Sequence, residues 1–203
     1  MPCCKARYLS LLEAENLMGE DIGDVTHELK VLADHNIRYL VLHKQFATAE
    51  QMMLWRQWLV YAPVHEDDEV VVYETTPVYG RDYEIAQPVT DAIGLIAFDS
   101  NLGALGGQML QAGTVQVFAQ WGSRAAPGRA YQSCLNLHGP AQEQHCFDLG
   151  GEWPSQNWAD NEIVRDAQCT DQPFLEAGDY ALSLKLVDTE TRDAVGDPSR
   201  WAI

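Results

Sequence analysis

The segment from Trp153 to Trp158, WPSQNW, holds the residues of this chain best suited to contact a ligand. Its two indoles can offer flat faces to sugar rings, while Asn157, Asp160 and Asn161 can add hydrogen bonds. The same pattern fits a structural role, because tryptophan usually buries most of its area and Trp158 could close the end of a hydrophobic core. Both interpretations stay open, and the core role is favoured.

Motifs that would support catalysis are absent from the sequence. The acidic run Glu66–Glu69 lacks the alternating Asp-x-Asp spacing of calcium loops, so it predicts a solvated turn rather than a metal site. No His-x3-His pair occurs, no serine lies in a Gly-x-Ser-x-Gly context, and the glycine-rich stretch Gly103–Gly107 lacks the Lys-Ser/Thr of a phosphate loop. The sequence therefore predicts no catalytic residue, no metal ligand and no cofactor.

Two of the five cysteines are informative. Folding the segment Tyr131–Leu149 into a hairpin about Pro140 places Cys134 opposite Cys146, and directly opposed residues on antiparallel strands lie within disulfide range. The alternative is a pair of small hydrophobic side chains buried side by side. A disulfide would indicate that this part of the chain has met an oxidising compartment.

The run Asn36–Lys44, NIRYLVLHK, is nearly all apolar between its ends and follows an amphipathic helix with Val25, Leu29 and Leu32 on one face. Asn36 can end that helix, because asparagine tolerates the left-handed conformation. A short, nearly continuous apolar run is typical of a strand covered on both sides. The sequence therefore predicts a strand here that is buried on both faces.

A second helix is predicted from the capping box Thr48–Gln51 to about Tyr61. It carries two apolar stripes, Met52, Trp55 and Leu59 on one and Leu54, Trp58 and Tyr61 on the other. That is more apolar surface than one packing face requires, so part of it should meet a sheet, a second domain or a missing partner. With the strand Val70–Tyr73, these elements predict a small α/β domain over residues 1–84.

From Ala92 onward, short alternating apolar segments separated by turn residues are typical of an all-β sandwich. The predicted strands are Ile93–Asp99, Thr114–Trp121, Tyr131–His138, Gln144–Leu149, Glu162–Cys169 and Asp179–Asp188. With a linker in Thr76–Pro88, we predict an α+β protein: a small α/β domain over residues 1–84, then an immunoglobulin-like antiparallel β-sandwich over residues 85–203.

The charge and hydropathy of the chain exclude some partners. Its 203 residues carry a formal net charge of −17, which opposes nucleic acid and anionic membrane surfaces. No run approaches the roughly 18 apolar residues that span a bilayer. We expect the chain to be soluble, although it could be a piece of a membrane protein.

The order of these elements resembles a known family. Asn36–Lys44 and Pro63–Tyr73 are similar to the soluble segment after the last membrane span of bacterial multi-spanning glycosyltransferases of the dolichyl-phosphate-mannose mannosyltransferase type. Val115–Trp121, Trp158 and Ala177–Asp188 resemble the β-sandwich at the C-terminus of such proteins. The resemblance covers most of the chain and rests on packing residues. In that family the catalytic acidic residues lie on loops of the membrane domain, so none is carried over.

Three functions follow as hypotheses. The first, which the resemblance implies, is a non-catalytic accessory region on the extracytoplasmic face of the membrane, in contact with the membrane domain of a parent protein, a glycan or a lipid-linked sugar. The alternative is a carbohydrate-binding β-sandwich module that uses Trp153, Asn157, Trp158 and Asp160. The third is an uncharacterised soluble enzyme with its site in a cleft between domains.

Overall fold

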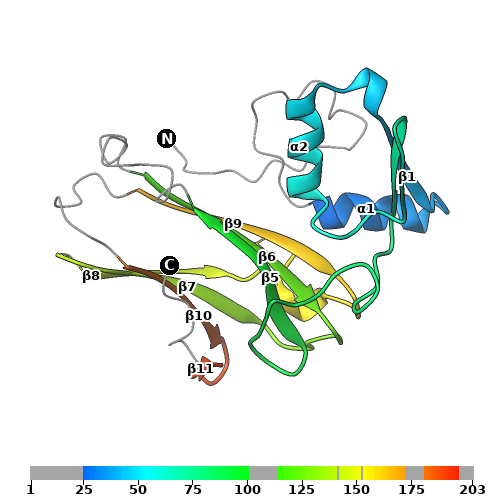
Figure 1. The fold of residues 1–203 in the computed structure, drawn as a ribbon. Helices are drawn as coiled ribbons and strands as arrows, with labels where there is room; N and C mark the ends of the chain where they lie inside the picture. The colour runs from blue at the N-terminus through cyan, green and yellow to red at the C-terminus, as the bar shows by residue number, and fades with distance from the viewer. Residues whose placement is uncertain (1–24, 101–113, 141, 152, 172–180, 197–203) are drawn as a thin grey trace.

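The computed structural model of the protein describes residues 25–100, 114–140, 142–151, 153–171 and 181–196, which form the coloured elements of Figure 1. The helices are α1 (Val25–Asp34), η2 (Lys44–Phe46), α2 (Ala49–Trp58) and η4 (Ser155–Asn157). The strands are β1 (Tyr39–His43), β2 (His65–Glu66), β3 (Val70–Glu74), β4 (Gln87–Pro88), β5 (Ile93–Ser100), β6 (Thr114–Ser123), β7 (Tyr131–His138), β8 (Gln142–Asp148), β9 (Ile163–Asp171), β10 (Ala181–Asp188) and β11 (Ala194–Val195).

The C-terminal part is an antiparallel β-sandwich. One four-stranded sheet has the order β4-β5-β6-β9 and the other has the order β11-β10-β7-β8. The six predicted strands correspond to β5 through β10, and the predicted bounds of β7 are those observed. The short edge strands β4 and β11 were not predicted, because two residues carry no periodicity.

The inner faces of both sheets supply the core of the sandwich. Alternate residues of each long strand point inward, which is the period-2 pattern visible in the sequence. The buried members of this core are Ile93, Leu95, Val117, Ala119, Trp121, Leu135, Leu137, Leu149, Trp158, Val164, Leu184 and Leu186.

The hairpin β7–β8 has the register predicted from its turn. Cys134 and Cys146 lie directly opposite one another and are joined by a disulfide. The sulfur atoms therefore link the central strand β7 to the edge strand β8 of one sheet.

The N-terminal part is built on a three-stranded antiparallel sheet with the order β1-β3-β2. Asn36, after α1, has a φ of 62°, in the left-handed region expected for a residue that ends a helix. Thr48 begins α2 with the predicted capping box: the backbone N–H of Gln51 donates to the Thr48 hydroxyl, and the backbone N–H of Thr48 donates to the Gln51 side chain. No helix among the described residues is long and apolar enough to cross a membrane.

The prediction that the strand after Asn36 is buried on both faces is wrong. In β1, Leu40 and Leu42 pack against the core, whereas Tyr39, Val41 and His43 are exposed. The reason is that α1 and α2 add to the core on one side of the small sheet only, so the other face of β1 is exposed. In addition, β1 is an edge strand of that sheet. A nearly continuous apolar run therefore occurs here in a strand with one exposed face.

The second core joins the two parts of the molecule. Its buried members are Leu29, Leu59, Tyr61, Val71, Tyr73, Tyr83, Ile85 and Ile163. Ile163 begins β9 of the sandwich, so α1 and the small sheet share a hydrophobic cluster with the sandwich. In α2 the expected stripe is present in part, since Met52 and Trp55 pack against this core, but the side chains of Leu54 and Trp58 lie outside the described residues.

The disulfide should stabilise the protein by restricting the unfolded chain. Replacing Cys134 and Cys146 by alanine together is expected to lower the free energy of unfolding by about 3 kcal/mol, the value for a loop of this size. Urea denaturation of the oxidised wild type and of the double variant measures the difference. Reduced wild type is the control, and equal stability of its oxidised and reduced forms would contradict the prediction.

Candidate functional site

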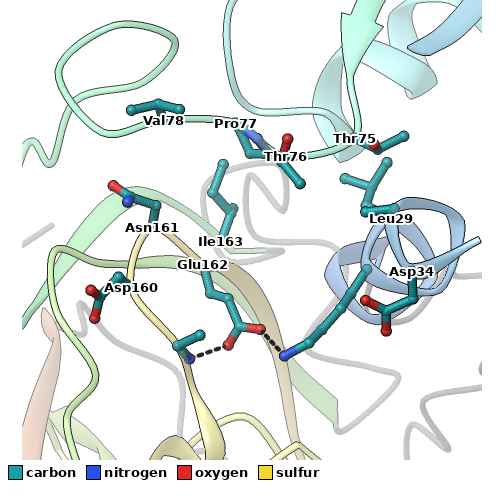
Figure 2. A pocket seen from close by; sticks show the side chains of 13 residues that line it. Leu29, Asp34, Thr75, Thr76, Pro77, Val78, Asp160, Asn161, Glu162 and Ile163 are labelled. Atoms are coloured by element: carbon teal, nitrogen blue, oxygen red, sulfur yellow. Dashed lines mark hydrogen bonds and ion pairs between the residues drawn. The ribbon is translucent and has the colours of Figure 1, made fainter. Parts of the chain in front are cut away.

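A pocket lies where α1 meets the sandwich. Three segments line it: α1, the chain after β3 at residues 75–78, and the turn before β9 at residues 159–163. Its volume is about 350 Å³, within the usual range of small-molecule sites. Figure 2 shows the labelled side chains of these three segments around the pocket.

Glu162 is the central polar group of the pocket. Its side chain is almost fully buried, and one carboxylate oxygen accepts a hydrogen bond from Lys30 Nζ at 3.0 Å. The other oxygen accepts from the indole N–H of Trp153 at 3.2 Å and from the backbone N–H of Ala159 at 2.9 Å. Lys30 Nζ also lies 5.0 Å from the centroid of the Trp153 ring. Both carboxylate oxygens thus have hydrogen-bond donors, one on Oε1 and two on Oε2.

The turn that carries Glu162 is fixed to the neighbouring strand by Ser123. The Ser123 hydroxyl donates to the carbonyl oxygen of Ala159 at 2.6 Å and accepts from the backbone N–H of Glu162 at 2.9 Å. Asn161 has a φ of 62°, and its side-chain oxygen accepts from the backbone N–H of Tyr79 at 3.1 Å. These bonds hold the turn against both β6 and the segment after β3.

The walls of the pocket are mostly apolar. Leu29 and Ala33 come from α1, Pro77 and Val78 from the segment after β3, and Ile163 from the start of β9, where Figure 2 shows it pointing toward the Pro77 side. Carboxylates stand among them: the exposed residues Asp34 and Asp160 also line the pocket. Lys30 also lines the pocket but is paired with Glu162, so an apolar hollow edged by two exposed carboxylates suits an apolar group that carries a cation.

Trp158 occupies the core position that the sequence favours, which leaves its indole faces covered. Trp158 is 1% exposed within the sandwich core, and its indole N–H donates to the carbonyl oxygen of Trp153 at 2.7 Å. Trp153 packs against the same core and has Lys30 over its ring. Asn157 and Asp160 are exposed, but no pair of open indole faces accompanies them, so the loop does not form the predicted platform.

The acidic run forms a charged turn between β2 and β3. Glu66 accepts from Lys44 Nζ at 2.8 Å and from Arg56 at 2.6 Å. Asp67 accepts from the backbone N–H groups of Val70 and Glu69, and these bonds, with the His65 side chain, lower the pKa of Asp67 to about 2. Within the described part of the chain, no three metal-ligating side chains are grouped around one point.

A network of two arginines and two carboxylates joins the small sheet to the linker, and sequence reasoning missed it. The guanidinium of Arg38 donates twice to buried Glu74, at 3.2 and 3.0 Å, and Arg81 bridges Glu74 to Asp82. The hydrogen bond from Arg81, followed by that from the backbone N–H of Val78, lowers the pKa of Asp82. The adjacent charges Arg81-Asp82 in the predicted linker were the available signal.

Another buried carboxylate, Asp166, lies inside the sandwich. Asp166 accepts hydrogen bonds from the Ser133 hydroxyl at 3.0 Å and from the side-chain amide of Gln168 at 2.7 Å, and all three residues are buried. The serine proton is directed at a carboxylate between the sheets rather than at a base beside a pocket. The group is structural: it satisfies an interior charge.

No protein-family model matches the chain, and no curated protein matches it. Among solved structures, the crystal structure of chicken MD-1 complexed with lipid IVa is similar, with 15% identity, a TM-score of 0.31, and coverage of 67% of this chain and 91% of that one. At this TM-score the similarity carries no inference about fold or ligand. The resemblance to membrane glycosyltransferases stays a prediction.

The pairing of Lys30 with Glu162 should couple α1 to the sandwich. In a double-mutant cycle with Lys30→Met and Glu162→Gln, we expect a coupling free energy of about 0.5–1 kcal/mol, because the lysine side chain is 39% exposed and solvent weakens the pair. Chemical denaturation of the wild type, both single variants and the double variant provides the measurement. Additive losses would show that the ion pair does not stabilise the junction.

The stability of the protein should depend on pH through Asp82. Since the folded-state pKa of Asp82 lies below its unfolded value of about 3.9, its contribution is complete above that pH and is lost as the pH falls toward the folded pKa. Asp82→Asn should therefore be less stable than wild type at pH 7 and lose less stability between about pH 5 and pH 2. Urea unfolding across that range tests this, and parallel profiles would contradict it.

Proposed function

We propose that this chain is a non-catalytic binding module and that the pocket between α1 and the turn at residues 159–163 is where it contacts its ligand. The three hydrogen bonds that Glu162 accepts carry the proposal. A general acid or base must exchange a proton with a substrate, whereas this carboxylate accepts from Lys30, Trp153 and Ala159 at once. A group held in this way can shape a pocket and orient a ligand.

The ligand class follows from the lining. Leu29, Pro77 and Ile163 favour an apolar group, and Asp34 and Asp160 favour a positive charge next to it. The net charge of −17 would add long-range attraction for such a ligand. A side chain or headgroup with a short hydrocarbon segment ending in an ammonium group has this chemistry.

The disulfide between Cys134 and Cys146 supports an extracytoplasmic location, because such bonds persist in oxidising compartments. Together with the resemblance, this leads to the fuller form of the proposal: an accessory region of a membrane-bound glycosyltransferase-like protein, with a small α/β domain at residues 1–84 and an immunoglobulin-like sandwich at residues 85–203. Its partner would be the membrane domain or a glycan or lipid-linked substrate.

Filling the pocket should weaken ligand binding without unfolding the protein. With n-hexylammonium as the probe, ¹⁵N NMR titration of wild type should shift the amide signals of Leu29, Thr76 and Ile163, and Ala33→Phe should weaken binding by about tenfold or more. Val31→Phe is the matched control, because it adds an aromatic ring to the same helix at an exposed position outside the lining.

Hexanoate serves as the charge-reversed probe. It should bind more weakly than n-hexylammonium, because Asp34 and Asp160 repel a carboxylate. Equal binding of both probes, or binding that survives in Ala33→Phe, would overturn the assignment of the pocket.

A further inference from the structure

The outer edge of β1 presents an ordered row of backbone groups. The backbone N–H of Thr75 donates to the carbonyl of Arg38 and that of Lys44 donates to the carbonyl of Glu69, so the even-numbered residues of β1 are the ones hydrogen-bonded to β3. The N–H and C=O groups of the odd-numbered residues Tyr39, Val41 and His43 therefore point away from β3. Among the strands that the structure describes, none pairs with this edge.

This edge lacks the features that usually protect an edge strand from pairing. Natural edge strands are blunted by charged residues, by proline or by bulges. The sequence of β1 is YLVLH, without a charged residue or proline, and its register runs without a shift from Tyr39 opposite Glu74 to His43 opposite Val70. The edge is therefore free of bulges and of formal charge from Tyr39 to His43, so it can accept another strand.

Exposed apolar side chains concentrate at the same place. Eight large hydrophobic residues are exposed in the described part of the chain, and four of them lie between Ile37 and Phe46. Tyr39 is 46% exposed, Val41 is 45% exposed and Phe46 is 79% exposed. Figure 1 places β1 at the periphery of the molecule, away from the sandwich. The open face and the open edge of β1 thus belong to one surface.

The charge around β1 makes it the place where two copies of an acidic protein can meet. No carboxylate occurs between Asp34 and Glu50, although the chain has 30 acidic residues. The flanking cations are already neutralised within the chain, Arg38 by Glu74 and Lys44 by Glu66. Repulsion between two chains of net charge −17 is therefore reduced along Tyr39–His43, and the nearest acidic run, at residues 66–69, lies beside Lys44 at the end of the strand.

We infer that this surface pairs with a second copy of the chain, β1 against β1, antiparallel about a two-fold axis at Val41. In this register Val41 faces the partner's Val41, and Tyr39 faces the partner's His43. Each opposed pair joins two residues whose backbone groups point outward, so each exchanges two hydrogen bonds. The three-stranded sheets of the two copies become one continuous sheet.

Side-chain contacts favour the same register. The rings of His43 and Phe46 lie 5.9 Å apart, and Tyr39 of the partner would join them as a cross-strand aromatic group. The pairing places no like charges opposite one another within YLVLH; just outside it, Arg38 would lie opposite the partner's Lys44, and each of these cations is paired with a carboxylate of its own chain. A five-residue strand buries less area than the interfaces of permanent dimers, so the dimer is reversible and forms as the concentration rises.

Sedimentation velocity over a concentration series tests this inference, which does not depend on the function proposed for the pocket. The weight-average mass of wild type should rise from 22.7 kDa toward twice that value. Val41→Lys should abolish the rise, because it places two ammonium groups opposite each other on the axis. Val64→Lys should dimerise like wild type: Val64 is 44% exposed, a close match to Val41, but lies beside the other edge strand, β2.

Amide hydrogen exchange at low and high concentration tests the register. The amides of Tyr39, Val41 and His43 should gain protection as the concentration rises, whereas those of Leu40 and Leu42 should be protected at both concentrations. A wild type that stays monomeric at every concentration would overturn the inference. Binding of a different protein's strand to β1 would not rescue it, because the inference is that β1 pairs with a second copy of this chain. Dimerisation of Val41→Lys at wild-type strength, with circular dichroism showing an intact fold, would overturn it as well.

Discussion

The hydrogen bonds of Glu162 are the constraint on which the arrangement of this molecule depends. The side chain joins Lys30 of α1 to Trp153 and Ala159 of the sandwich, and the backbone is held by Ser123 of β6. A buried carboxylate is stable only when its oxygens are paired. The bond from Lys30 therefore helps to keep α1 against the sandwich, and the pocket lies between Leu29 and Ile163 at that contact.

The apolar contacts at the junction act together with this ion pair. Ile163 follows Glu162 directly and packs into the core of the N-terminal part, and Tyr83 from the linker joins the same cluster and donates to the carbonyl of Ser123. Arg81 fixes the linker to Glu74. A hydrophobic cluster without these polar bonds could slide, whereas the combination defines one orientation of the two parts.

Features that depend on neighbours along the chain were predictable. The capping box at Thr48, the left-handed Asn36, the strands of the sandwich and the register that opposes Cys134 to Cys146 all follow from local spacing. The pocket was not predictable, because its three walls come from segments far apart in the sequence. Among its lining residues, Asp160 and Asn161 are predicted from the sequence to contact a ligand, but as part of the loop around Trp158.

The sequence by itself determined the alternation of the strands, the ends of the helices and the absence of a catalytic motif, since these rest on side-chain type and on periods of a few residues. Tertiary structure alone decided which apolar residues are covered. Trp158 and Val41 are both apolar, yet one closes the sandwich core and the other lies open on an edge strand. The physical reason is that burial depends on the order of strands in a sheet and on what packs over it, and periodicity does not encode either one.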